Sequence, residues 1–339
     1  MTAYFLRRFL LIIPTFIGIT MLVFVVTRFV PGGPIERMIT QAQMMQGDRG
    51  GMSDGVSGAA LSEDQIEDMK KYYGFDKPPL EAYVIWLWKV LHLDLGVSSR
   101  YNEPVWNIIK ERFPVSIFYG LTTMIIAYLV SVPLGIIKAI KHSTLFDNIT
   151  SGMVFLGFAI PNYVLGIGLI VLFASQWEVF PLGQFRSDDW EDLTTWGKIV
   201  DQVYHAVLPI TSYLAGTFAV TTLLTKNSLM DNLAADYVRT AIAKGLPFKK
   251  AIFGHALRNS LIPLATSFGN NISVLLAGSF LVETVFNIDG FGLLGFESVV
   301  ERDYPVVMGI LVLSSLLFLI GNILSDICVA LVDPRVQFE

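Results

Sequence analysis

Six apolar segments dominate the 339-residue sequence and constrain the kind of fold it can adopt. Each is long enough to cross a bilayer hydrocarbon core of about 30 Å as a helix. Hydrophobic residues make up 53% of the chain and charged residues 16%, which is more apolar than a soluble domain needs. We therefore expect an all-α membrane protein with six transmembrane helices. The expected spans cover residues 9–30, 114–138, 150–175, 205–225, 260–286 and 305–330.

The distribution of basic residues predicts the orientation of these spans. Lysine and arginine concentrate before the first span, after the second and after the fourth, whereas segment 176–204 is acidic. Arg7 and Arg8 precede an apolar run that continues to Val30 without a small-residue cleavage site, so this run is expected to remain as a span. Because basic residues favour the cytoplasmic side, both termini, including the tail 331–339, are predicted to be cytoplasmic.

A long extracytoplasmic insert, residues 31–113, is expected between the first two spans. Residues 47–59 are rich in glycine, serine and aspartate and predict a loop. A capping box predicts a helix over residues 62–73, and an amphipathic run follows at 83–95. Two tryptophans in this run fit either a membrane interface or an outer cap that contacts another protein: Trp86 and Trp88.

The segment 231–263 lies between the fourth and fifth spans of the expected membrane core, residues 114–330. It predicts two short amphipathic helices broken at Gly245, which follows a terminal lysine as a helix C-cap would. Pro247 is placed to open the second helix. Six basic residues but only two aspartates fall between positions 226 and 258. This pattern fits a hairpin on anionic lipid, a topological anchor, or a docking surface for a cytoplasmic partner.

The chemistry that the sequence lacks narrows the function classes. No phosphate-binding loop of the form G-x-x-x-x-G-K-[ST] occurs, and no spacing of histidine, cysteine or carboxylate suggests a metal site or a catalytic cluster. We therefore expect no enzyme activity, cofactor or metal in this chain. Cys328 is the one cysteine, which excludes an internal disulfide.

Two carboxylates fall near the ends of expected spans. Proton- or sodium-driven carriers usually place such groups deep in the bilayer. A secondary carrier is therefore one alternative, with Glu283 as its candidate residue, although a pairing role suits a lone carboxylate near the outer interface better. Asp326 is expected at the cytoplasmic rim, facing a basic residue. A polytopic membrane enzyme is the third class, and it would need a catalytic cluster.

Residues 239–245 (RTAIAKG) resemble the cytoplasmic EAA loop of ABC importer permeases, in the form used by the binding-protein-dependent dipeptide/oligopeptide branch. Arginine stands at position 239 where the founding motif has glutamate, and Pro263 lies 18 residues after Gly245; both departures suit the peptide branch. The resemblance covers nearly the whole chain: YFLRR at 4–8, PGGP at 31–34, YGFDKP at 73–78, DLGVS at 94–98, HALRN at 255–259, LIP at 261–263, ETVF at 283–286, GFG at 290–292, RDYP at 302–305 and DPR at 333–335.

The resemblance implies the six-helix type I importer permease fold, with the insert between helices 1 and 2. The Gly-rich insert, TKNS at 225–228 and LVDPR at 331–335 resemble most closely the B-type permeases of microcin C/oligopeptide importers. The implied function is to form half of the translocation pathway of an ATP-driven peptide importer in a bacterial inner membrane. Energy would come from another subunit.

The same resemblance implies the partners and the coupling residues. The partners would be a second homologous permease, ABC ATPase subunits that bind ATP and Mg²⁺, a periplasmic peptide-binding protein, the peptide and membrane lipid, with no nucleic acid. Residues that would couple the ATPase to the pore are Tyr237, Val238, Arg239, Thr240, Ala241, Ala243, Lys244, Gly245, Leu246 and Pro247.

Overall fold

The structure is a computed structural model that describes residues 2–29 and 76–332. The predicted loop 47–59, the predicted helix 62–73 and the motifs at 31–34 and 333–335 lie outside the described residues. Contacts divide the chain into a first unit (Met1–Leu10, Glu111–Leu294 and Leu316–Glu339) and a second unit (Leu11–Lys110 and Gly295–Ser315).

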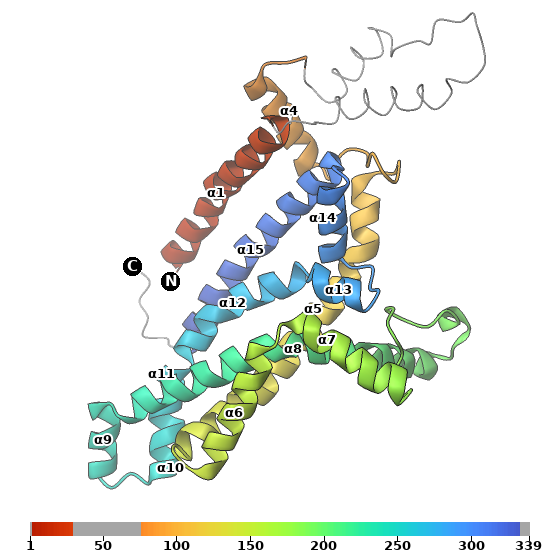
Figure 1. Cartoon of the computed structure of the whole chain (residues 1–339). Helices are drawn as coiled ribbons and strands as arrows, with labels where there is room; N and C mark the ends of the chain where they lie inside the picture. The colour runs from red at the N-terminus through yellow and green to blue at the C-terminus, as the bar shows by residue number, and fades with distance from the viewer. Residues whose placement is uncertain (1, 30–75, 333–339) are drawn as a thin grey trace, which may run out of the picture. The chain divides into compact units, whose positions relative to one another are not determined.

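Helices provide almost all the regular structure of the described residues. In chain order they are α1 (Thr2–Phe29), α4 (Pro79–Leu91), α5 (Val105–Ile140), α6 (Leu145–Ala159), α7 (Asn162–Leu169), η1 (Ile170–Gln176), η2 (Trp190–Asp192), α8 (Thr195–Leu233), α9 (Asp236–Ala243), α10 (Phe248–Ala251), η3 (Ile252–Ala256), α11 (Leu257–Ser260), α12 (Ile262–Leu276), α13 (Phe280–Val285), α14 (Phe291–Val300) and α15 (Tyr304–Val332) (Figure 1).

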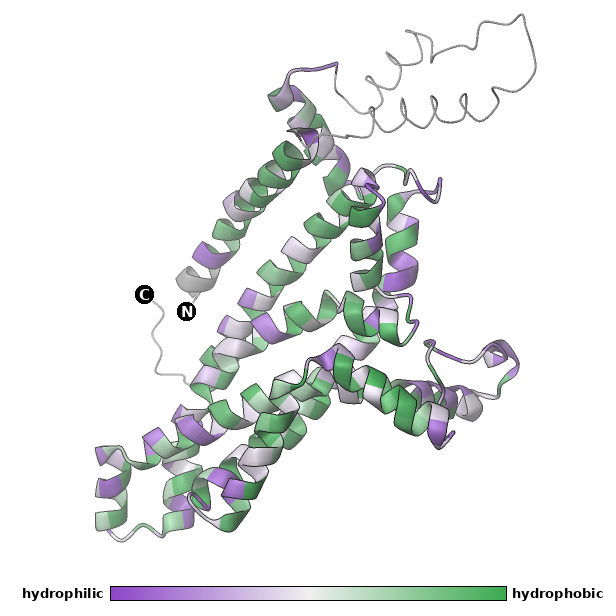
Figure 2. Cartoon of the chain, viewed as in Figure 1, coloured by the Kyte–Doolittle hydropathy of each residue, from purple (hydrophilic) through white to green (hydrophobic). Residues whose placement is uncertain are grey.

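Four helices of the described chain are long and apolar enough to cross a membrane on their own. They contain the predicted second, fourth and sixth spans and most of the predicted first span. Apolar residues cover most of their length (Figure 2): Leu6–Arg28, Val105–Ile140, Thr195–Leu233 and Tyr304–Val332. The second and fourth helices are longer than the predicted spans. Pro114, the first residue of the predicted second span, lies inside α5, and α8 extends from Thr195 to Leu233. At 39 residues, α8 is about 58 Å long.

The predicted third span, 150–175, is not one straight helix. α6 ends at Ala159, and the axis turns by 98° before the α7–η1 segment begins at Asn162. Pro161 causes the break, because a proline excludes the helical conformation from the residue before it. Ile160 is accordingly extended, with ψ of 122°.

The predicted fifth span, 260–286, is also broken. α12 has 15 residues, and Gly278 (φ +77°) then turns the chain into the six-residue α13. Neither helix is long enough to cross a bilayer by itself. Of the six expected spans, the described chain thus shows four as single helices long enough to cross a membrane, and a fifth crossing if the α6–α7 pair is one span.

Small residues bring α12 and α15 close together within the first unit. A Cβ atom at Gly269 of α12 would lie 1.6 Å from the carbonyl oxygen of Gly321 of α15. The Ser273 hydroxyl donates across the same interface to the carbonyl of Leu317 at 3.0 Å, and the Ser325 hydroxyl donates to that of Ala265 at 2.9 Å. Ser273 therefore has a packing role at the α12–α15 interface.

The main apolar core of the first unit gathers residues from α5, α8 and the α13 region. Its centre holds the fully buried Phe286, whose backbone carbonyl accepts a hydrogen bond from the Gln184 amide at 2.7 Å. Around it pack buried side chains that include Tyr119, Met124, Leu208, Tyr213, Val282 and Ile288.

In the second unit, α4 packs on α1 through aromatic contacts. The Tyr83 hydroxyl lies 3.0 Å from the Thr20 hydroxyl, and the Phe24 ring centroid lies 5.6 Å from those of both Tyr83 and Trp86. The Trp86 side chain is therefore part of a small core. Trp88, by contrast, is 65% exposed.

The second unit also joins two motifs of the family resemblance. Asp303, fully buried, accepts hydrogen bonds from the Ser98 hydroxyl and from the amides of Ser99 and Arg100. The Arg100 guanidinium pairs with Glu297 at 2.6 Å. DLGVS at 94–98 and RDYP at 302–305 thus form one polar cluster, although the sequence separates them by about 200 residues.

Candidate functional site

The turn at Gly245 has the geometry that its position predicts. Gly245 has φ of +91°, and its amide donates to the carbonyl of Ile242 at 2.9 Å. The Leu246 amide donates to the carbonyl of Ala241 at 3.1 Å. These two bonds form a Schellman motif, which ends α9 and satisfies carbonyls left without helical partners. The predicted C-cap is confirmed.

The second helical stretch begins directly after Pro247, as predicted, but it is not a uniform helix. α10 is a single turn, η3 is a π-helical segment, and α11 completes the stretch at Ser260. The first helix also starts later than expected, because α8 runs on to Leu233 and α9 begins at Asp236. We call residues 236–260 the α9–α11 hairpin.

One face of the hairpin packs on the ends of α5 and α8. Val238, Ala251 and Ile252 are buried, at 0–1% exposed, against Ala139 of α5 and Leu229 of α8. The Ser260 hydroxyl donates to the carbonyl of Ser228 at 3.3 Å, which ties α11 to the same helix. The hairpin is therefore part of the helical core of the first unit.

The other face of the hairpin is exposed. Of the ten predicted coupling residues, Val238 is buried and Ala241 and Leu246 are partly buried. The other seven are exposed: Tyr237, Arg239, Thr240, Ala243, Lys244, Gly245 and Pro247. Three large apolar side chains are also exposed: Ile242 by 39%, Phe248 by 52% and Phe253 by 58%. The lysines that follow Pro247 are exposed beside them. Such a mixture of apolar and basic groups suits a protein partner.

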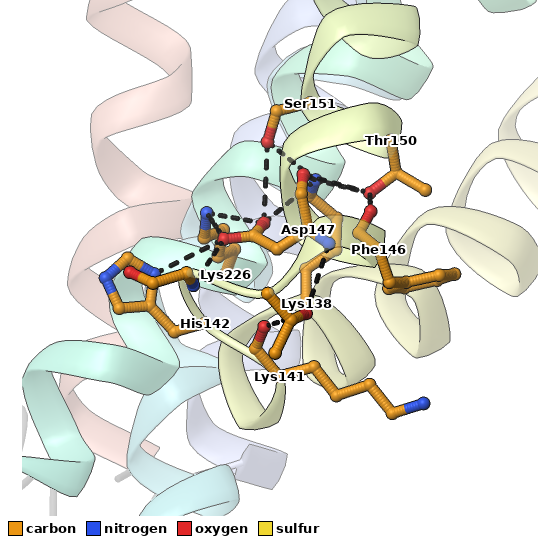
Figure 3. Close-up of polar contacts among 10 residues, drawn as sticks. Lys138, Lys141, His142, Phe146, Asp147, Thr150, Ser151 and Lys226 are labelled. Carbon is orange, nitrogen blue, oxygen red and sulfur yellow. Dashed lines mark hydrogen bonds and ion pairs between the residues drawn. The ribbon is translucent and has the colours of Figure 1, made fainter.

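A buried ion cluster lies next to the hairpin (Figure 3). Asp147, at the start of α6, receives the Lys226 ammonium of α8 at 2.7 and 2.8 Å from its two carboxylate oxygens. The Lys138 ammonium of α5 lies 3.1 Å from the same carboxylate and is fully buried. His142 approaches from the exposed side, with Nδ1 3.4 Å from Oδ2 of Asp147.

Hydrogen bonds satisfy the remaining groups of this cluster. The Lys138 ammonium donates to the Thr150 and Ser151 hydroxyls, each at 2.8 Å. The Ser143 amide donates to Asp147 at 3.1 Å. We call Lys138, Asp147 and Lys226 the lysine–aspartate cluster. Sequence reasoning counted Lys138 as a topological signal and missed the cluster, although Asp147 is the only acidic residue between positions 138 and 151.

The other carboxylates near span ends have structural partners. Arg8 Nε pairs with Asp326 at 3.0 Å, which confirms the expected basic partner. Glu283 is 1% exposed and accepts hydrogen bonds from the Leu293 amide at 2.5 Å and, at longer range, from the Ser116 and Tyr213 hydroxyls. Leu293 lies in the first turn of α14, so Glu283 caps that helix from α13.

Glycines enclose the Glu283 carboxylate. A Cβ atom would lie 2.3 Å from its Oε1 at Gly278 and 2.5 Å from its Cδ at Gly290. The GFG motif at 290–292 and the ETVF motif at 283–286 therefore belong to one arrangement, in which the carboxylate satisfies the backbone of α14. This geometry favours a structural role for Glu283 over proton transfer.

Replacing Glu283 with glutamine should reduce the amount of folded permease but not its transport per molecule. The amide side chain replaces a charged acceptor, and hydrogen bonds to charged groups contribute about 1.5–3 kcal/mol. Uptake divided by the permease present in the membrane should stay near that of the parent. A loss of uptake at a normal permease level would instead support the secondary carrier.

Comparisons with known proteins place the chain in a family. A family model described as the inner membrane component of binding-protein-dependent transport systems matches residues 131–338. The chain belongs to this family. The matched region includes the α9–α11 hairpin, the lysine–aspartate cluster and the Glu283 arrangement. Members are non-catalytic inner-membrane subunits that work with an ABC ATPase and a binding protein, so the enzyme alternative is excluded and the expected resemblance is confirmed.

Full-length relatives carry permease names. The chain is 40% identical to a peptidoglycan transport system permease protein, YejB, of Agrobacterium fabrum, over all of this chain and 99% of that protein. It is 39% identical to the inner membrane ABC transporter permease protein YejB of Escherichia coli and 34% identical to the dipeptide transport system permease protein DppB of that species, each over the full length of both chains.

Proposed function

We propose that this chain is one of two homologous permease subunits of an ATP-driven importer of peptides. The observation that carries the proposal is the α9–α11 hairpin, whose inner face is packed on α5 and α8 while its outer face exposes apolar and basic side chains. Such a surface can receive force from a partner and pass it to the spans. ATP and Mg²⁺ would bind to the partner ATPase in this proposal, which is consistent with a sequence that contains no phosphate-binding loop.

The proposed topology has six crossings with both termini in the cytoplasm. α6 with α7–η1 would make the third crossing, and α12 with α13 the fifth, since broken helices are tolerated where protein or water satisfies the freed backbone groups. The basic hairpin then faces the cytoplasm and the acidic segment 176–204 faces the periplasm, in agreement with the positive-inside rule. Lipid would contact the outward faces of the spans.

Peptides are the proposed substrate class because the relatives' names share that chemistry. Dipeptides are themselves peptides, and peptidoglycan contains peptide stems. A periplasmic peptide-binding protein would deliver the substrate to the permease pair, and microcin C-type peptides fall within the same class. No nucleic acid is involved in this proposal.

Mass spectrometry of the proteins that co-purify with this chain in mild detergent tests the assembly. We expect a second homologous permease and an ATPase with a phosphate-binding loop. Purification of this chain alone, together with peptide uptake that an uncoupler abolishes, would overturn the proposal in favour of a secondary carrier.

Uptake in vesicles tests the substrate class. With the complex and its binding protein reconstituted, labelled oligopeptide should enter only when ATP is present. Excess dipeptide, oligopeptide or muropeptide as competitor then identifies the preferred length and chemistry. If none of these competitors reduced uptake and the complex instead took up an unrelated solute, the proposed peptide substrate class would be contradicted.

A further inference from the structure

We propose that Lys226, acting through Asp147, is a positioning residue that makes the α5–α6 turn move together with α8 and the α9–α11 hairpin. This inference rests on the proposed coupling function and names residues outside the predicted coupling loop. The inference is based on an ionic link between helices beside the surface that would receive force, in which Asp147 is buried and the Lys226 side chain is 12% exposed.

The lysine–aspartate cluster has two separable halves. Lys138 and Asp147 lie on either side of the turn between α5 and α6, and their contact holds that turn together. Lys226 comes from α8, and its ammonium reaches both carboxylate oxygens of Asp147. The Lys226–Asp147 pair is therefore the ionic connection from the α5–α6 turn to α8.

Close packing flanks this connection on both sides. One turn away along α5, a Cβ atom at Gly135 would lie 2.6 Å from Cβ of Thr225 and 2.8 Å from the Thr222 carbonyl oxygen. On the other side, Ala139 packs with Leu229 in the apolar cluster that holds the α9–α11 hairpin. α5 and α8 are thus held at successive turns that lead directly to the hairpin.

The Lys226–Asp147 ion pair is better suited to fixing one arrangement of the helices than to stabilising the fold. Buried ion pairs add little net stability relative to apolar packing, and their best attested role is to fix one arrangement over others. The Lys226 ammonium contacts both oxygens of the Asp147 carboxylate, so the pair holds α8 at a short, fixed distance from the start of α6. A sliding movement of α8 past α6 would break these bonds.

The charges of the lysine–aspartate cluster allow a variant that should impair coupling without preventing folding. Lys226→Met removes the link but leaves Asp147 neutralised by the buried Lys138. Asp147→Asn instead leaves two ammonium groups without their carboxylate, which should prevent folding. Lys226→Arg keeps the charge and can bind both oxygens. Lys141→Met is the matched control, because Lys141 lies in the same turn but points away from Asp147 (Figure 3).

The test compares ATP hydrolysis with peptide uptake in reconstituted complexes. For Lys226→Met we expect a normal amount of assembled complex and continued ATP hydrolysis, but about tenfold less peptide taken up per ATP, in the range of ordinary coupling free energies. Lys226→Arg should restore much of the peptide uptake per ATP that Lys226→Met loses, and Lys141→Met should have the same uptake per ATP as the parent.

Two results would overturn the inference. Unchanged uptake per ATP in Lys226→Met would show that the link does not contribute to coupling. A loss of complex that accounts for the whole loss of uptake would show a purely structural role. Failure of the parent complex to show ATP-dependent uptake would instead count against the proposed function, so the two failures are distinguishable.

Discussion

Replacing Gly245 with valine is expected to abolish peptide uptake while the permease remains inserted in the membrane. Gly245 has φ of +91°, a conformation that a β-branched residue adopts at a cost of about 1–3 kcal/mol. The substitution therefore breaks the Schellman turn between α9 and Pro247. Apart from the residues next to it in the chain, no atom of the described residues lies within 4 Å of the position that a Cβ atom would take, so the spans themselves should tolerate the change.

Valine at this position could act by breaking the backbone turn or by adding bulk where a partner binds, and asparagine separates these two effects. Asparagine adopts positive φ more readily than other residues with a side chain, so Gly245→Asn should keep the turn while adding bulk. Uptake assays and membrane immunoblots should be run on both variants. Recovery with asparagine would assign the defect to the backbone, and failure of both would assign it to space needed by a partner. Normal uptake with valine would count against a coupling role for the turn.

Replacing Gly269 with alanine should eliminate most of the folded permease, even though only one methyl group is added. That carbon would lie 1.6 Å from the carbonyl oxygen of Gly321 and 2.4 Å from its carbonyl carbon. Backbone atoms cannot rotate away as a side chain can, so α12 and α15 would have to separate. The hydroxyl bonds of Ser273 and Ser325 across this interface would lengthen with them. We expect the free energy of unfolding to fall by about 3 kcal/mol, the upper end of the usual cost of overpacking.

Gly168→Ala provides the matched control for this prediction. Gly168 is also helical, in α7, but within the described part of the chain its added Cβ would have no atom within 4 Å other than those of its chain neighbours and its own helix backbone. Alanine favours a helix over glycine by about 1 kcal/mol, so this variant should be as stable as the parent or more stable. The midpoint of thermal unfolding of the detergent-solubilised protein measures the stability of both variants. Equal midpoints for the parent and Gly269→Ala would contradict the close α12–α15 contact.

Local sequence features predicted the parts of the structure that depend on neighbouring residues. Hydrophobic length located the spans, and the lysine before Gly245 together with Pro247 located the turn of the hairpin. These signals act within a few residues, where backbone preference and side-chain periodicity decide the outcome.

The remaining features depend on contacts that no local pattern contains. The third span was predicted as a single helix. Pro161 ends α6, and the 98° bend also depends on where α7 packs, including the bond from the Ser212 hydroxyl to the Asn162 carbonyl. Lys226 and Asp147 are 79 positions apart, and their pairing arises only when α8 lies beside α6. The exposed face of the α9–α11 hairpin could be predicted from its own residues, whereas the packing of its inner face on α5 and α8 could not.

The length of α8 has a mechanical consequence. It is one continuous helix from the acidic segment to the α9–α11 hairpin, about 58 Å long and nearly twice the thickness of a hydrocarbon core. A stiff rod of this kind acts as a lever, because both ends must move when its tilt changes. A rotation of about 5° about its midpoint would displace each end by about 2.5 Å in opposite directions. In the proposed topology, force applied to the hairpin end of α8 would thus move its periplasmic end without any helix unfolding.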